Sequence, residues 1–130
     1  MPDLVVDASL VAKWLVEEPY SAEAKILLRE WAGAEVALYS HVILPSEISN
    51  ALYKRIKRGE LGLDEALEAW KDFWTIPIVH LDGEELGRRA LILARDLDRP
   101  DSYDALYLAT AEFLGCELWT ADDRLYHAAV

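Results

Sequence analysis

Short apolar runs alternate along this chain with longer segments in which apolar residues recur every three or four positions. The short runs predict strands at residues 4–6, 35–40, 76–81 and 116–121, and the first of them is typical of a buried parallel strand. The longer segments predict helices at residues 9–18, 21–33, 44–59, 63–74, 82–97, 101–115 and 122–129. Pro19 separates the first two helices, and Ser21 is the expected N-cap of the second.

Strands that alternate with helices favour crossovers between parallel strands. The expected fold class is therefore α/β, a three-layer α/β/α sandwich around a central parallel sheet. In sheets of this kind, functional side chains gather at the carboxyl ends of the strands.

The length of 130 residues corresponds to one domain, and a hydrophobic content of 53% is enough for a packed core. No run reaches the roughly 18 apolar residues of a membrane span, and the first residues lack the pattern of a signal peptide. We therefore expect a soluble, cytoplasmic protein. The single cysteine, Cys116, is typical of a small buried residue rather than a nucleophile, so redox chemistry is not expected.

The charge balance is strongly acidic, with 24 acidic and 13 basic residues and a formal net charge of −11. This opposes non-specific attraction to nucleic acid, because that attraction depends on Lys and Arg at the phosphates. A polyanionic substrate would need a bound metal or a local basic patch. A basic partner protein would be favoured.

Two predicted strands are followed by aspartates. Asp7 comes directly after the first strand, and Asp122 and Asp123 follow the fourth. Each could cap the helix that begins there, and each could instead be a metal ligand. One cap explains only one of the two adjacent aspartates.

Two further acidic residues lie early in predicted helices. Glu47 heads a polar stripe that runs beside the apolar face of its helix, and a solvated helix surface is the competing interpretation. Asp104 lies in a helix so apolar that it should be mostly buried, although Asp104 could form a capping box with Asp101. A carboxylate in a buried helix is costly unless it is paired or metal-bound.

The four acidic positions Asp7, Glu47, Asp104 and Asp122 could converge on one cleft. Carboxylates about 5 Å apart repel by about 3 kcal/mol per pair at an effective dielectric constant of about 20. Protons or cations must offset such repulsion. Oxygen-rich sites of this kind suit Mg²⁺ or Mn²⁺.

Three blocks of the sequence, VVDASLVAKWL, PSEISNAL and YDALYLATAEFLGCELWTADDRL, occur in an order and spacing that resemble the PIN-domain ribonucleases, most closely the VapC-type toxins of toxin–antitoxin pairs. The resemblance implies a single PIN domain over residues 1–130, with Asp7, Glu47, Asp104 and Asp122 as the catalytic, metal-binding carboxylates. It implies that further polar residues support the site or contact phosphate, namely Ser9, Asn50 and Thr120, with Asn50 orienting Glu47. Asp123 stands where the family is variable, so we expect it to cap the last helix or to support the site from behind the metal ligands.

The function implied by the resemblance is Mg²⁺- or Mn²⁺-dependent hydrolysis of RNA, leaving 5′-phosphate and 3′-hydroxyl ends. The implied partners are an RNA substrate, a VapB-type antitoxin and a second copy of the chain in a homodimer. The family also has a fifth edge strand after the last short helix, where the printed sequence ends, so a sheet of four to five strands is expected.

Two other segments allow more than one interpretation. The basic patch Lys54, Arg55, Lys57 and Arg58 could follow the RNA backbone, with Lys54 and Arg58 as the contacts, receive an acidic antitoxin segment, or be an ordinary helix end. The aromatic residues Trp70, Phe73 and Trp74 fit core packing, or a groove for an antitoxin helix or a second copy.

Two other classes of protein compete with a ribonuclease. Phosphoaspartyl hydrolases need an aspartate where this chain has Ser9, and receiver domains need an early acidic pair that is not placed properly here. A PIN fold used only for protein binding would be expected to have a broken carboxylate set, whereas all four positions are filled.

Overall fold

A computed structural model describes residues 3–122, which form four strands and six helices. The strands are β1 (Asp3–Val6), β2 (Ala37–His41), β3 (Ile78–Leu81) and β4 (Glu117–Trp119). The helices are α1 (Ala8–Leu15), α2 (Ser21–Gly33), α3 (Ile43–Lys57), α4 (Leu63–Phe73), α5 (Glu84–Asp96) and α6 (Tyr103–Leu114). None of these helices combines the length and the apolar character that crossing a membrane requires.

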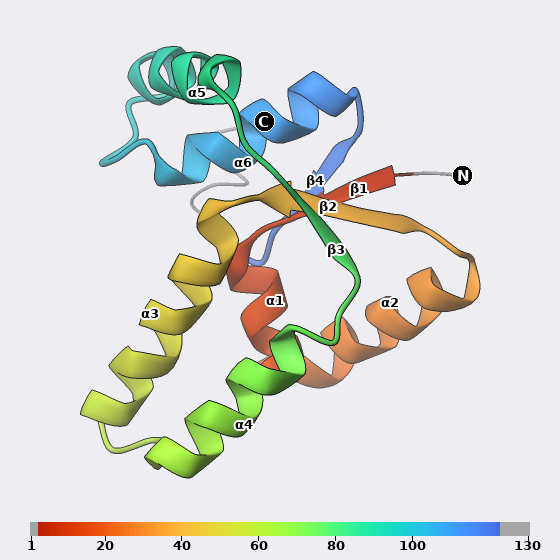
Figure 1. Cartoon of the computed structure of the whole chain (residues 1–130), viewed down its shortest axis with the longest axis vertical. Helices are drawn as coiled ribbons and strands as arrows, with labels where there is room; N and C mark the ends of the chain where they lie inside the picture. The colour runs from red at the N-terminus through yellow and green to blue at the C-terminus, as the bar shows by residue number, and fades with distance from the viewer. Residues whose placement is uncertain (1–2, 123–130) are drawn as a thin grey trace.

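The four strands form one parallel sheet in the order β3-β2-β1-β4. Helices α1 to α4 lie on one face of the sheet and helices α5 and α6 on the other (Figure 1). The predicted α/β/α sandwich with a parallel sheet is therefore confirmed. The expected helix at 122–129, apart from Asp122, and a fifth strand beyond it lie outside the described residues.

The strand order places a change of direction at β1. The chain moves outward from β1 to β2 and β3 and then returns to β4 on the opposite side of β1. Val6 pairs with Trp119 in the register of β1 and β4, so Asp7 and Thr120 emerge next to each other. Crevices at such points are the usual ligand sites of open α/β sheets.

Apolar side chains pack on both faces of the sheet. The larger cluster joins the sheet to helices α1 to α4 and includes Val6, Val11, Leu44, Ile48 and Phe73, all of which are at most 1% exposed. The smaller cluster joins α5 to α6 through Leu86, Ala90, Ala105 and Ala109. The alanines of α6 let the two helices approach closely, which makes α6 the central buried helix that its composition predicts.

Element ends differ from the predicted ones for local reasons. The first helix ends at Leu15 because Val16 is extended, with φ of −132°. The prediction that Ser21 caps α2 is wrong: Tyr20 holds the N-cap position with a left-handed φ of 69°. Ser21 is the first helical residue instead, and its buried hydroxyl donates to the carbonyl of Val16 and accepts from the N–H of Glu18, both at 3.0 Å.

Candidate functional site

Asp7 lies at the carboxyl end of β1 with only 3% of its surface exposed. It is the N-cap of α1, because its Oδ1 accepts a hydrogen bond of 3.1 Å from the N–H of Leu10. Its other partners are hydroxyls: Ser9 donates to Oδ1 at 2.8 Å, and Thr120 donates to Oδ2. The capping role and a role in a functional site are therefore compatible, since the side chain serves the helix with one oxygen.

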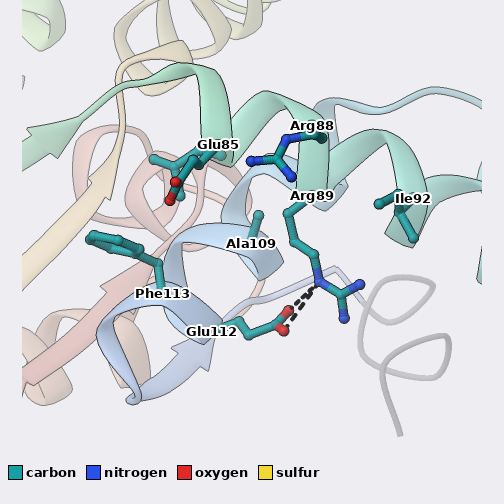
Figure 2. A pocket seen from close by; sticks show the side chains of 8 residues that line it. Glu85, Arg88, Arg89, Ile92, Ala109, Glu112 and Phe113 are labelled. Atoms are coloured by element: carbon teal, nitrogen blue, oxygen red, sulfur yellow. Dashed lines mark hydrogen bonds and ion pairs between the residues drawn. The ribbon is translucent and has the colours of Figure 1, made fainter.

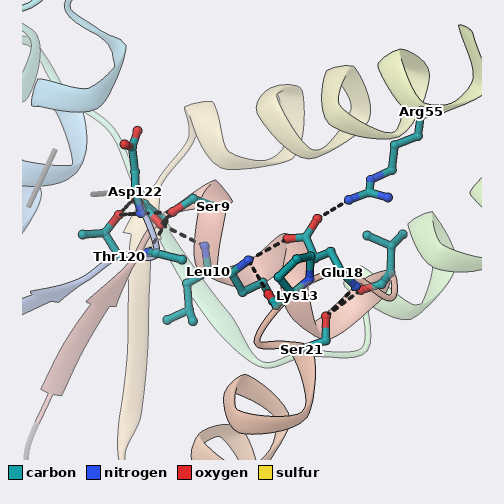
Figure 3. A network of polar contacts seen from close by, with 12 residues as sticks. Ser9, Leu10, Lys13, Glu18, Ser21, Arg55, Thr120 and Asp122 are labelled. Carbon is teal, nitrogen blue, oxygen red and sulfur yellow. Dashed lines mark hydrogen bonds and ion pairs between the residues drawn. The ribbon is translucent and has the colours of Figure 1, made fainter. Parts of the chain in front are cut away.

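A network of hydroxyls joins the start of α1 to the segment after β4 (Figure 3). The Thr120 hydroxyl accepts from the N–H of Asp122 at 3.0 Å, and the Ser9 hydroxyl accepts from the N–H of Ala121 at 2.9 Å. The two side chains expected from the sequence to support the site thus hold the backbone of Asp122 beside Asp7. Asp123, predicted as a cap or supporting residue, lies outside the described residues.

Burial raises the pKa of Asp7 from 3.8 to about 6. The hydrogen bonds from Thr120, Ser9 and Leu10 oppose this shift, whereas the negative charge of Asp122 adds to it. A buried carboxylate whose pKa is raised partly by a second carboxylate is a site where a cation would be stabilised.

Glu47 lies in α3, half-buried, and faces the other acidic residues. The hydroxyl of Tyr107 in α6 donates a hydrogen bond to its Oε1. Burial raises the pKa of Glu47, the Tyr107 hydrogen bond lowers it, and the charges of Asp104, Asp7 and Asp101 raise it further. Three acidic side chains from other segments therefore act on this one carboxylate.

Asp104 lies in the first turn of α6 and is held by an arginine. The Arg99 guanidinium donates to Asp104 Oδ2 at 2.7 Å, and the two side chains are 9% and 26% exposed. The competing capping-box interpretation does not describe this position, because the Asp101 carboxylate accepts from the N–H of Tyr103 and Asp104 pairs with Arg99. Arg99 therefore supplies the positive charge that a partly buried carboxylate needs.

The structure brings the four predicted carboxylates to one edge of the sheet, where Asp7 interacts electrostatically with Asp122 and Glu47, and Glu47 with Asp104. Within residues 3–122, no three acidic, histidine or cysteine side chains already converge as a metal cage. The carboxylates of Asp7, Glu47 and Asp104 are instead each held by hydrogen bonds from neighbouring residues. The donor set fits Mg²⁺ or Mn²⁺, because these ions take oxygen ligands and need few direct carboxylates while retaining waters.

A cleft of about 390 Å³ runs from this cluster along α3. The side chains that line it include Ser9, Glu47, Asn50, Lys54 and Arg58. Asn50 is exposed on the wall of this cleft, and the hydrogen bond to the Glu47 side chain described above comes from Tyr107. The polar stripe predicted on this helix thus forms one side of a groove that leads out of the acidic cluster.

The basic patch divides into residues with different partners. Arg55 pairs with Glu18, which also pairs with Lys13 at 3.2 Å, and all three side chains are at most 18% exposed (Figure 3). Arg58 is 60% exposed and pairs with Glu60 at 3.1 Å. Lys54, Arg55 and Arg58 all line the cleft. Arg55 is fixed there by its ion pair with Glu18, whereas Lys54 and Arg58 are exposed to solvent.

A second cavity, of about 300 Å³, lies between α5 and α6, away from the acidic cluster. Arg89 and Glu112 form an ion pair of 3.0 Å across it, and Phe113 lies at its side with 64% of its surface exposed (Figure 2). The two arginines at this cavity, Arg88 and Arg89, already pair with Glu84 and Glu112 within the chain, so the acidic cluster is the candidate site.

The aromatic side chains at the end of α4 differ in exposure. Phe73 is 1% exposed and belongs to the core, whereas Trp74 is 53% exposed. Leu63 and Leu67 extend the exposed apolar surface to the start of the helix, at 61% and 55% exposure.

Comparison with known proteins bears on this site. Residues 4–130 match the PIN domain family. The chain is 36% identical over 126 residues to Ribonuclease VapC3 of Pyrobaculum aerophilum, an alignment that covers 94% of this chain and 91% of that protein.

Two solved structures share the fold. The Pyrobaculum aerophilum protein PAE2754 has a TM-score of 0.72 at 23% identity, covering 98% of this chain and 86% of its own. VapC20 of Mycobacterium tuberculosis, described as a toxin that cleaves the sarcin-ricin loop, has a TM-score of 0.73 at 21% identity, covering 96% and 94%.

Proposed function

Because this chain belongs to the PIN-domain family, and within it to the VapC type, we propose that it is a metal-dependent endoribonuclease that acts as the toxin of a toxin–antitoxin pair. The observation that carries the proposal is the electrostatic coupling among Asp7, Glu47, Asp104 and Asp122, which come from four separate segments. Gathering like charges in this way does not stabilise the fold, since their mutual repulsion opposes folding.

The four carboxylates would hold Mg²⁺ or Mn²⁺, with Ser9 and Thr120 fixing Asp7 and Arg99 fixing Asp104. A bound divalent cation supplies Lewis acidity, which polarises a phosphodiester and stabilises the leaving oxygen. The protein's own contribution is to position these carboxylates and to supply their negative charge. Its carboxylates follow the carboxyl ends of two strands, β1 and β4, and lie on two helices, α3 and α6, so their geometry is set by the fold.

The cleft along α3 supports RNA as the substrate, despite the formal net charge of −11. Lys54 and Arg58 lie on its wall and can contact phosphates as the strand leaves the acidic cluster. Local positive charge next to a cation site lets an acidic protein bind a polyanion, because the contacts are made where the charge is favourable.

The same family implies a VapB-type antitoxin and a homodimer as partners. The exposed apolar side chains Leu63 and Leu67 of α4, and Trp74 directly after it, support a protein partner, because apolar side chains that gather on one surface usually mark an interface.

A ribonuclease assay on a structured RNA tests the proposal. The wild type should cleave with Mn²⁺ or Mg²⁺ and stop in excess chelator, and Asp7→Asn should lower cleavage by at least about 100-fold, since the metal would lose a ligand. Asp64→Asn, an exposed aspartate in α4, is the matched control and should cleave normally. Cleavage that persists in chelator, or that survives Asp7→Asn, would overturn the metal mechanism.

A further inference from the structure

Tyr107 lies at the centre of the fold, and its hydroxyl contacts the acidic cluster through Glu47. It is 1% exposed and its ring belongs to the larger core. Its hydroxyl donates to Glu47 Oε1 and also hydrogen-bonds to the backbone amide of Ala8, the residue after Asp7. One phenol therefore connects three elements of the site: α6, which carries Asp104, the glutamate helix α3, and the start of α1.

Packing alone does not account for a tyrosine at this position. A phenylalanine would fill the same core volume without bringing a hydroxyl that needs a partner. The hydroxyl here meets a half-buried carboxylate. A phenol ordinarily loses its proton only at about pH 10, so at neutral pH the group is an uncharged donor.

A neutral donor has a specific advantage at a cation site. Arg99 holds Asp104 with a positive charge, which would also repel a cation at that carboxylate. A phenol orients a carboxylate without adding charge, and it occupies only one of the two oxygens of Glu47. The second oxygen of Glu47 can thus face a metal ion while the first is fixed.

On the premise of the metal-dependent activity proposed above, we infer that Tyr107 is a positioning residue, whose hydroxyl holds the Glu47 carboxylate in the orientation that binds the divalent cation. Hydrogen-bond partners of metal ligands typically change metal affinity by about 10- to 100-fold when they are removed. Tyr107→Phe should therefore weaken Mn²⁺ binding by at least about 10-fold.

The test measures Mn²⁺ dissociation constants from the electron paramagnetic resonance signal of free Mn²⁺, with wild type, Tyr107→Phe and Tyr103→Phe. Tyr103 lies one turn earlier on α6, is 52% exposed, and is the matched control that should bind like the wild type. In the cleavage assay, kcat of Tyr107→Phe at limiting Mn²⁺ should fall while KM for RNA stays unchanged, and excess Mn²⁺ should restore kcat.

A double-mutant cycle separates positioning from a purely structural role. In a Glu47→Gln background there is no carboxylate to orient, so adding Tyr107→Phe should change Mn²⁺ affinity by less than about two-fold. Thermal melting checks that each variant is folded. If Tyr107→Phe alone is unstable, the comparison is made between Glu47→Gln and the double variant Glu47→Gln/Tyr107→Phe. The double variant leaves no half-buried charge without a hydrogen-bond donor.

Three results would overturn the inference. Tyr107→Phe could be folded and bind Mn²⁺ as tightly as the wild type. It could also weaken binding equally in the presence and absence of the Glu47 carboxylate. If the wild type itself bound no Mn²⁺, the proposed function would fail together with the role of Tyr107, whereas the first two results leave the proposed function standing.

Discussion

Replacing Asp7 by Asn should make the metal-free protein more stable at neutral pH while it abolishes metal binding. Asp7 is 3% exposed and has a pKa raised from 3.8 to about 6. Asn is about as good an N-cap as Asp, so the hydrogen bond from the N–H of Leu10 is retained. The change therefore removes the buried charge and leaves the capping function in place.

The pKa shift gives the magnitude and its direction with pH. A carboxyl whose pKa is higher in the folded state binds its proton more tightly there, so ionisation destabilises the fold. This penalty is absent below about pH 4, grows as pH rises from 3.8 to about 6, and is fully present above that range. A difference of about two pH units corresponds to about 3 kcal/mol. Reversing the Thr120 hydrogen bond to suit an amide costs about 1 kcal/mol, which leaves a net gain of about 2 kcal/mol at pH 7.5.

Urea unfolding in excess EDTA at several values of pH measures this gain. The free energy of unfolding of Asp7→Asn minus that of the wild type should rise from about −1 kcal/mol at pH 4 to about +2 kcal/mol at pH 7.5. Asp64→Asn, at an exposed position, is the control for the loss of one negative charge. A difference for Asp7→Asn that is independent of pH, or that is negative at pH 7.5, would refute the assignment of a buried, destabilised carboxylate.

Three further predictions concern metal, RNA and the paired aspartates. Mn²⁺ at about 100 times its dissociation constant should stabilise the wild type by about 2.7 kcal/mol in thermal melting and leave Asp7→Asn unchanged; equal shifts would place the ion elsewhere. Changing both Lys54 and Arg58 to Ala should weaken RNA binding and reduce the slope of log affinity against log salt by about 1.4, and an unaltered slope would remove them from the RNA path. Asp122→Asn should lower cleavage more than Asp123→Asn does. Equal losses would contradict the assignment of Asp122 as the metal ligand and of Asp123 as only a cap or supporting residue.

Much of the fold follows from local patterns in the sequence. Alternation of apolar runs with helical spacing was sufficient to predict four strands and the helices between them, although burial varies from β1, where Leu4, Val5 and Val6 are buried, to β4, where Glu117 and Trp119 are exposed. The ends of elements depend on backbone details that spacing does not carry. Tyr20 adopts a left-handed conformation that a tyrosine rarely takes. Pro77 lacks the N–H that a strand would use, so β3 begins at Ile78, two residues after the predicted start at residue 76.

The acidic positions of the candidate site could be proposed from the sequence because strand ends and helix starts are local features. Their partners could not. Tyr107 is 60 residues from Glu47, and its spacing in α6 is that of an ordinary core residue. Arg99 lies in a loop where nothing marks it as the partner of Asp104, and Glu18 follows a helix end where its pairing with Arg55 depends on tertiary packing. These pairs form through tertiary packing, so they become visible only in the three-dimensional structure.

Anomalous X-ray scattering from crystals of the full chain soaked in Mn²⁺ tests the central claim most directly, because it locates the ion without reference to activity. A Mn²⁺ peak should lie among Asp7, Glu47, Asp104 and Asp122, bound directly or through water. A fully occupied Mn²⁺ peak elsewhere, with none among these four carboxylates in a protein that cleaves RNA with Mn²⁺, would contradict the account.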